Sequence, residues 1–297
     1  DGDTLSLIVT GSKTTLNSDA EEDTYTADTE NYTKLYTYDI SDRSQPQLTG
    51  VVQQQGHYST SRKNGDIVYL FTQFDPQVSD ASEIDEYIPA VNGARMESSD
   101  IFLPEYQNST SCLVISSVST GKPDAIIDQK AVVSAAENFY VSENNIYVYD
   151  TIYDAKVSPV TQTEIRKVSY KNGELDGTGD VVIDGMVNDS FSIDEYNGYL
   201  RVVTTIREND DTSGGVNPLL RTDSASNTGS QGADSTNALY ILDKDLKETG
   251  KLDNLAEDER VYSARFMGDT CYFVTYKQVD PLFSVDLSDP KKPKVLG

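Results

Sequence analysis

The clearest regularity along the chain is a tight polar turn followed by a short strand of aromatic and β-branched residues. Turns of the Asn-Gly type supply the positive φ angles that a two-residue hairpin loop requires. Four copies of a turn with its following strand occur, at Asn64–Asp66 with Ile67–Thr72, Asn144–Asn145 with Ile146–Tyr149, Asn197–Gly198 with Tyr199–Val203, and Gly268–Asp269 with Thr270–Val274. Each copy predicts a β-hairpin.

Further short strands flank each of these copies and complete a repeat of four. Those before the turn are His57–Arg62, Asn138–Ser142, Ser190–Asp194 and Val261–Phe266. The third strands are Leu35–Asp39, Cys112–Val118, Glu164–Ser169, Leu239–Asp243 and Leu282–Asp286. The fourth are Gln47–Val52, Asp124–Asp128, Gly179–Ile183, Glu248–Leu252 and Pro293–Leu296.

A repeat of four short strands predicts an all-β fold, a β-propeller of four-stranded antiparallel blades. We expect one β-propeller domain, or a segment of one, over residues 1–297. The blade units are expected at about 3–55, 56–131, 134–184, 188–254 and 259–297. The first unit begins at its second strand, Thr4–Val9, so it is expected to be incomplete, and the closure of the ring stays open.

Composition agrees with a sheet protein, since Tyr is abundant at 19 residues and Trp is absent. The 24 basic and 49 acidic residues give a net charge of −25, which disfavours nucleic acid and anionic membranes as partners. Such acidity favours solubility outside the cell, with cation binding as the alternative. No stretch of about 18 apolar residues and no signal peptide is found in the sequence, although either a signal or an anchor could have been removed. We expect a secreted or cell-surface monomer.

Two cysteines are too few for a disulfide framework. Cys112 and Cys271 fall in apolar strands of non-adjacent blades. We therefore expect two buried free thiols, with a single disulfide as the alternative.

Four long segments resemble a family of secreted bacterial and archaeal proteins that carry a C-terminal β-propeller domain. They are Phe191–Arg201, Glu259–Asp269, Val279–Phe283 and Asp286–Gly297. The resemblance implies a propeller fold, an extracellular location and further propeller sequence on both sides of this chain. It implies no mechanism, because the role of that family is not established.

The long insertions all fall between second and third strands, at 11–33, 73–111 and 208–237. Because strand direction alternates within a blade, these insertions should share one face of the propeller, and long loops on a rigid scaffold favour a binding surface. The middle insertion should pack on the blades because it carries the apolar residues Ile84, Tyr87, Ile88, Ile101, Phe102, Leu103 and Tyr106. Residues 222–236, rich in Ser, Asn, Gly and Thr, are expected to be disordered.

The individual candidates for chemistry are weak. Asp39, Asp243 and Asp286 recur at the end of third strands, which predicts a carboxylate accepting hydrogen bonds from the next turn; Ser41–Asp42 and Ser288–Pro290 extend this turn chemistry. His57 is the one histidine and has no nucleophile motif nearby, so we expect no catalytic role for it. The acidic runs 19–32 and 210–215 favour solvated loops, with calcium as the alternative.

Three functions are compatible with these patterns. The one favoured is a non-catalytic extracellular scaffold that binds an unknown protein or glycan on the face of the insertions, with no catalytic, metal or other site residue assignable. No Gly-x-Ser-x-Gly, phosphate-binding loop or Cys/His cluster occurs, which disfavours an enzyme. A carboxylate-based polysaccharide hydrolase or lyase is the first alternative, because paired acids about 5–10 Å apart are invisible in sequence. A structural cell-surface spacer is the second.

Overall fold

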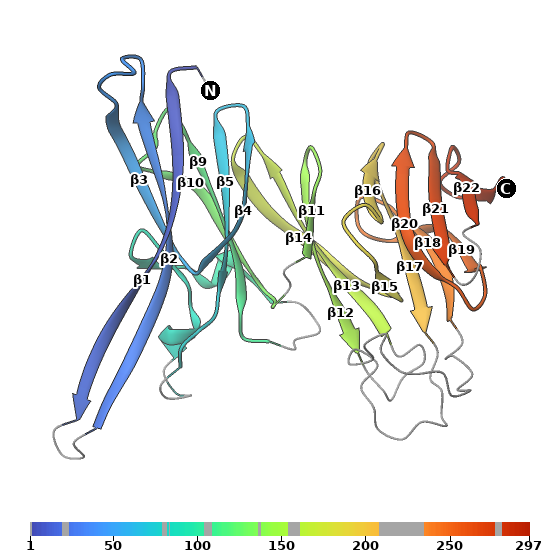
Figure 1. The fold of residues 1–297 in the computed structure, drawn as a ribbon, viewed down its shortest axis with the longest axis horizontal. Helices are drawn as coiled ribbons and strands as arrows, with labels where there is room; N and C mark the ends of the chain where they lie inside the picture. Colours follow the sequence, from blue (N-terminus) through green and yellow to red (C-terminus); the bar gives the residue numbers. More distant parts are fainter. Residues whose placement is uncertain are drawn as a thin grey trace. The chain divides into compact units, whose positions relative to one another are not determined.

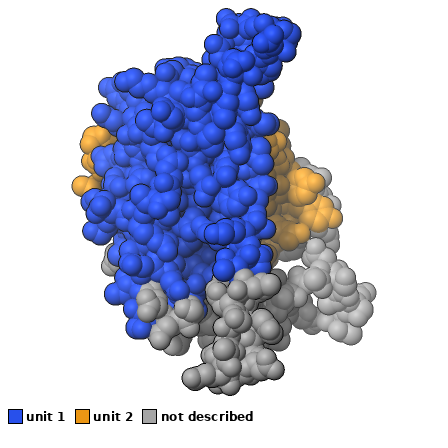
Figure 2. Space-filling view, turned by 90° about the vertical axis from the view of Figure 1, so that its left-hand side faces the viewer, with its two compact units in different colours: residues 1–137, 143–146, 167–178 blue, residues 138–142, 147–166, 179–297 orange. Residues whose placement is uncertain are grey.

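The computed structural model consists mainly of β-strands, grouped in five mostly antiparallel sheets that follow one another along the chain (Figure 1). It describes residues 2–19, 24–78, 82, 84–103, 109–135, 138–153, 161–207, 235–276 and 281–297. The chain divides into two compact units (Figure 2). Unit 1 comprises residues 1–137, 143–146 and 167–178, and unit 2 comprises 138–142, 147–166 and 179–297. No helix in the described residues is long and apolar enough to cross a membrane.

The first sheet contains β1 (Thr4–Asp19), β2 (Thr24–Asp39) and β3 (Gln47–Gln55). β1 and β2 pair in continuous register from Thr4 opposite Asp39 to Asp19 opposite Thr24. The loop predicted over 11–33 is therefore wrong, because most of it is a two-stranded antiparallel ribbon. Its many threonines and tyrosines fit a pleated ladder, but its polar composition gave no apolar alternation by which a buried strand is recognised.

The second sheet is the predicted four-stranded blade. Its strands are β4 (His57–Asn64), β5 (Ile67–Phe74), β9 (Cys112–Ser119) and β10 (Ile126–Val133). Ile67 pairs with Asn64 across the two-residue turn, and Gly65 there has a φ of 60°. The hairpin inferred from this turn is confirmed.

The insertion between β5 and β9 is ordered where it is described. It forms the 3₁₀ turns η1 (Ile84–Tyr87) and η2 (Ser98–Asp100) and the short strands β6 (Ala90–Val91), β7 (Ala94–Arg95) and β8 (Ile101–Phe102). β6 extends the first sheet beyond β3, and β8 lies parallel to β10. The predicted packing is confirmed for Ile88 and Ile101, whereas Ile84 and Leu103 are exposed. Tyr106 lies outside the described residues.

The remaining three sheets also follow the predicted repeat. The third is β11 (Asn138–Val141), β12 (Asn145–Tyr153), β13 (Thr161–Lys171) and β14 (Glu174–Asp184). The fourth is β15 (Met186–Val187), β16 (Ile193–Tyr196), β17 (Tyr199–Arg207), β18 (Ser235–Leu242) and β19 (Glu248–Leu255). The fifth is β20 (Arg260–Met267), β21 (Thr270–Tyr276), β22 (Leu282–Asp286) and β23 (Lys294–Val295). Of the third predicted insertion, residues 208–234 lie outside the described residues and 235–237 belong to β18.

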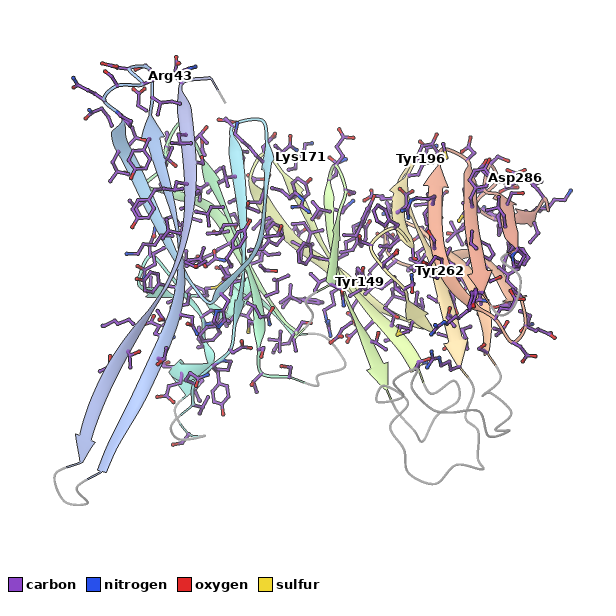
Figure 3. All side chains as sticks on the ribbon, in the orientation of Figure 1. Arg43, Tyr149, Lys171, Tyr196, Tyr262 and Asp286 are labelled. Carbon is purple, nitrogen blue, oxygen red and sulfur yellow. The ribbon has the colours of Figure 1, made fainter. Side chains whose placement is uncertain are left out.

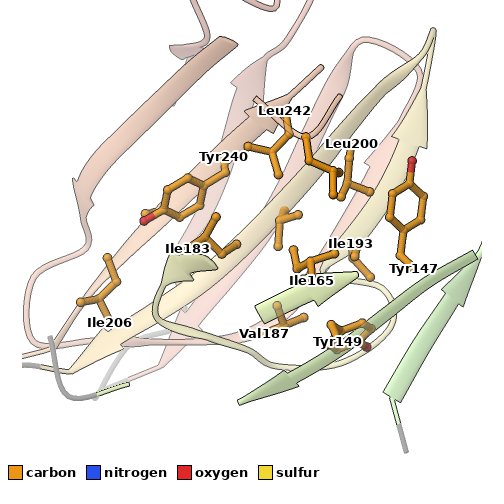
Figure 4. Close-up of a cluster of buried hydrophobic side chains, with 13 residues drawn as sticks. Tyr147, Tyr149, Ile165, Ile183, Val187, Ile193, Leu200, Ile206, Tyr240 and Leu242 are labelled. Carbon is orange, nitrogen blue, oxygen red and sulfur yellow. The ribbon is translucent and has the colours of Figure 1, made fainter. Parts of the chain in front are cut away.

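Each unit has its own buried core between sheets. In unit 1, Leu35 and Val52 of the first sheet pack with Val68 and Leu70 of the second. In unit 2, thirteen buried residues form one cluster, part of which Figure 4 labels. The apolar side chains come from alternate positions of their strands, as a sheet with one face against a neighbour requires.

Candidate functional site

A pocket of about 320 Å³ opens in unit 1, between the β1–β2 ribbon, the start of β4 and the insertion that follows β5. Its charged side chains are Lys13, Glu30, His57, Asp75, Glu86 and Arg95. Both signs of charge are therefore present. The described structure thus brings the first two predicted insertions together around one cavity.

Gly56 lines this pocket at the passage from β3 into β4. It has a φ of 100°, and a Cβ built on it would lie 2.4 Å from the carbonyl oxygen of Gln73. Only glycine combines such a φ with so close an approach. The Gly56 amide donates to the carbonyl of Asn31 at 2.8 Å, and its own carbonyl accepts from Thr33 Oγ1 at 3.1 Å. His57, the next residue, is thereby fixed as an exposed group of the pocket wall.

Gln55 ties the ribbon to the insertion. Its Nε2 donates to Glu30 Oε1 at 2.6 Å, while its Oε1 accepts from the Ala90 amide at 2.7 Å. Arg95 donates to the same Oε1 at 3.4 Å and to the carbonyl oxygen of Ile88. One side chain thus fixes the positions of a carboxylate and a guanidinium that both line the pocket. Sequence reasoning missed Gln55, because its partners lie 25 and 35 residues away.

Two further hydrogen bonds fix the pocket-lining residues at the end of β5. Asp75 accepts a hydrogen bond from Ser111 Oγ at 2.6 Å, and Gln73 Nε2 donates to the carbonyl of Ser134 at 2.8 Å. Phe74 between them is buried and joins the apolar core. The pocket is therefore a preorganised polar cavity above an apolar base. Its amides, hydroxyls and charges can bind a hydrogen-bonding ligand, and its three carboxylates could also serve acid–base chemistry.

The recurring aspartates are confirmed as turn residues. Asp39 Oδ1 accepts from the Ser41 amide at 2.8 Å, and Asp286 Oδ1 accepts from the Ser288 amide at 2.9 Å (Asp286 is labelled in Figure 3). Asp243 Oδ1 accepts from two amides of its turn. Hydrogen bonds from Ser41 and from Ser288 lower the pKa of Asp39 and of Asp286, since they stabilise the charged carboxylate.

The Ser-Asp steps continue this chemistry. Asp42 accepts from the amide of Ser44 at 2.9 Å and Asp289 from the amide of Lys291 at 3.0 Å. All of these hydrogen bonds run within single turns, so these carboxylates stabilise the turns of the blades.

A buried charge of unit 2, that of Arg201, is also structural. Arg201 on β17 is 3% exposed, pairs with Asp194 on β16, and donates to the carbonyl of Gly268 at 2.6 Å. Its guanidinium lies 4.8 Å from the ring centre of Tyr196 and 4.9 Å from that of Phe266. The adjoining cavity is only about 40 Å³, room for little more than a water molecule. This arrangement ties the fourth sheet to the fifth.

The remaining expectations concern thiols and metals. Cys112 and Cys271 are both free and buried, as expected. Among the residues that the structure describes, no group of three or more His, Cys, Asp or Glu side chains could hold a metal ion. Residues 20–23 and 210–215 of the acidic runs lie outside the described residues, so calcium binding there stays a hypothesis.

Comparison with known proteins gives a family and two groups of similar chains. The family described as "Beta propeller domain" matches residues 1–297. An uncharacterised protein of Methanocaldococcus jannaschii is 45% identical over 118 residues, which are 39% of this chain and 15% of that protein. One of Archaeoglobus fulgidus is 36% identical over 138 residues, or 46% of this chain and 18% of that protein. The matches thus span less than a fifth of either archaeal relative.

Two solved structures are similar at low identity. The β-propeller domain of the Trilobed protease from Pyrococcus furiosus is matched over 99% of this chain and 82% of that chain, at 9% identity and a TM-score of 0.29. The AtxE2 isopeptidase is matched over 100% of this chain and 49% of that chain, at 10% identity and a TM-score of 0.20.

Proposed function

Because the chain belongs to the β-propeller domain family, we propose that it is a non-catalytic extracellular scaffold that binds a glycan or peptide in the pocket of unit 1. A propeller presents its loops on a rigid frame, and binding residues on such frames lie in the loops. The pocket lies where two of the three insertions meet.

One observation carries this proposal, the hydrogen-bonded wall around the pocket. Glu30, Gln55 and Arg95 are held by mutual bonds before any ligand arrives. Because these side chains are already ordered, less conformational entropy is lost when a ligand binds. A cavity of about 320 Å³ lies at the low end of the range of small-molecule sites. A purely structural spacer would have no need of such a cavity.

The extracellular location rests on charge. A net charge of −25 in 297 residues keeps a protein soluble and repels anionic surfaces. The resemblance to secreted propeller proteins supports the same location. The chain spans less than a fifth of the length of the archaeal relatives that it matches. Any activity of a whole protein of that length is therefore also a proposal.

A glycan and peptide array tests the binding role. We expect the wild-type chain to retain at least one ligand class and His57→Ala or Lys13→Ala to weaken that binding about tenfold, because each side chain is exposed in the pocket. Lys122→Ala is the matched control, since Lys122 is an exposed cation in the turn between β9 and β10, outside the pocket. Binding that all three variants leave unchanged would place the ligand elsewhere and refute this site.

The carboxylates of the pocket favour one second candidate, a hydrolase or lyase acting on polysaccharide. Glu30, Asp75 and Glu86 line the same cavity, and a pair of carboxyl groups is the usual machinery of glycoside cleavage. Incubation of the protein with polysaccharides and reducing-end detection distinguishes the two functions. Turnover that is abolished by Glu86→Gln or Asp75→Asn would establish the enzyme and overturn the non-catalytic scaffold.

A further inference from the structure

In the first sheet, β3 ends where its neighbour β2 continues. The last pair between them joins Tyr32 of β2 to Gln55 of β3. Gly56, with a φ of 100°, then turns the chain from the first sheet into β4 of the second. Figure 1 shows the β1–β2 ribbon continuing past the end of β3. Residues 24–31 of β2 thus pair with β1 on one edge only among the described strands, and we call their other edge the open edge.

The open edge lies within the sequence and not at one of its ends. β1, which precedes β2 in the chain, pairs with the opposite edge of the same residues. β3, which follows β2, covers the open-edge side of the strand as far as Gln55. The position beside residues 24–31 is therefore the straight continuation of β3, which the chain leaves when it turns at Gly56.

The register of the first sheet determines which backbone groups point to the open edge. The Gly56 amide donates to the Asn31 carbonyl at 2.8 Å, so the backbone of Asn31 points toward the β3 side. Successive residues of an antiparallel strand direct their backbone groups to alternate edges. The N–H and C=O of Thr29 and Ala27 therefore point to the open edge, whereas those of Glu30 point to β1. The open edge thus presents two further donor–acceptor pairs in line with β3.

The pocket of unit 1 borders the open edge. Thr29, Glu30 and Asn31 are consecutive residues of β2, and all three line the pocket. Because successive side chains of a strand point to opposite faces, a cavity lined by three consecutive residues lies beside the edge of the strand and not over one face. Gln55 and Gly56 line the same cavity. The cavity therefore begins where β3 stops.

The side chain of Thr29 leaves its backbone accessible. Thr29 lies opposite Thr14 of β1, and the two Oγ1 atoms are 3.2 Å apart, within hydrogen-bond distance. The hydroxyl is thus turned toward β1, away from the open edge, and the residue is exposed. The main-chain N–H and C=O of Thr29 are therefore the groups that a ligand in the pocket meets at this position.

We propose that unit 1 binds an extended peptide, which pairs with residues 24–31 of β2 as an added antiparallel strand in line with β3. This inference rests on the proposed function and deepens it, because it selects a peptide as the ligand. An extended peptide presents one donor and one acceptor at every second residue of an edge, the same spacing as Thr29 and Ala27. A glycan has no such repeat. Main-chain hydrogen bonds supply the affinity, and side chains of the pocket contact alternate side chains of the peptide.

Two pools of capped random-sequence peptides, each peptide as long as residues 24–31, test this mode of binding on the immobilised protein. We expect the wild type to retain the ordinary pool, and to retain at least tenfold less of a pool methylated on every backbone nitrogen, which has no N–H to donate. Thr29→Pro should weaken retention of the ordinary pool about tenfold, since proline removes a donor from the open edge but none from the ladder with β1. Thr29→Val is the matched control, because it keeps the N–H and a β-branched side chain.

The outcomes separate this inference from the proposed function. Equal retention of the two pools, or equal losses in Thr29→Pro and Thr29→Val, overturns the added strand. Peptide binding that Lys13→Ala or His57→Ala still weakens then leaves the pocket as the binding site. Retention of glycans but of no peptide also overturns the added strand and leaves the pocket, whereas retention of neither class refutes both. Thermal unfolding shows whether Thr29→Pro is folded; if it is not, the two pools on the wild type decide, since that comparison needs no variant.

Discussion

Gly250 lies directly beneath the carbonyl of Pro290, so close that any side chain at position 250 would displace the backbone of the next blade. We expect Gly250→Ala to destabilise the protein by about 1–3 kcal/mol, the usual cost of overpacking a rigid contact. Thermal unfolding measures the loss. Gly121→Ala is the control, because the nearest atom to a Cβ there is the Ser119 hydroxyl at 3.5 Å. Equal stability of the two variants would show that the backbone around Pro290 can move to accommodate a side chain at position 250.

Arg201 should be indispensable to the packing of unit 2. Arg201→Ala leaves Asp194 without its cation and the Gly268 carbonyl without its donor. We expect a loss of about 2–3 kcal/mol in the free energy of unfolding, less than for a fully buried pair because the Asp194 side chain is 26% exposed.

A positive charge alone at position 201 should not restore the full stability of the protein. Arg201→Lys restores a cation but not the planar group between Tyr196 and Phe266, so it should recover only part of the loss. Lys244→Ala is the control, since its pair with Asp245 is exposed and contributes little. Full stability of Arg201→Lys in urea unfolding would contradict the role given to the two rings.

The two thiols should be inert in the folded protein. Burial raises the pKa of Cys112 to about 11 and that of Cys271 to about 12. At pH 8 the thiolate fraction is then about one in a thousand or less, and the thiolate is the reactive form. A chromogenic disulfide reagent should detect no thiol in the native protein and two in denaturant. Rapid reaction of either cysteine in the native state would show that its blade opens locally.

The turn aspartates should make stability depend on pH at the acid end. The pKa of Asp286 in the fold lies below its usual value, so the carboxylate's contribution is present above pH of about 4 and is lost as the pH falls through the lowered pKa. Asp286→Ala should lower Tm slightly at pH 6, and this difference should shrink as the pH falls toward 2. Asp124→Ala, at an exposed turn position with no side-chain hydrogen bond in the described structure, is the control. A Tm difference that persists unchanged at pH 2 would rule out the carboxylate as its cause.

The strands and hairpins could be predicted because their signals are local. Asn64–Asp66 marks a turn by its own residues, and Asp39 and Asp286 bond amides two positions away. The close contacts of Gly50 with Pro123 and of Gly250 with Pro290 could not be predicted, since each depends on a turn that approaches from another sheet.

The pocket escaped prediction for the same reason. Glu30, Gln55 and Arg95 meet only because a ribbon and an insertion converge on one strand. The sequence predicts insertions in the two regions that border the pocket, but the first of them, residues 11–33, contains a ladder of paired strands where a loop is predicted.

The pocket is bordered on one side by the β1–β2 ribbon and on another by the second blade, and these two parts differ in how firmly they are held. β2 pairs with β3 only from Tyr32 to Asp39, so among the described strands residues 24–31 pair with β1 alone, while Gly56 and Gln55 bond to Asn31 and Glu30 at the end of this stretch. A two-stranded ribbon without a third strand is marginal in water, whereas the opposite wall belongs to a blade with a buried core. Lys13 therefore lies on the two-stranded part of the ribbon, whereas His57 lies at the start of β4 and Asp75 just after β5. A ligand that contacts both Lys13 and His57 would stabilise the β1–β2 ribbon. Its affinity would therefore depend on the stability of the hairpin.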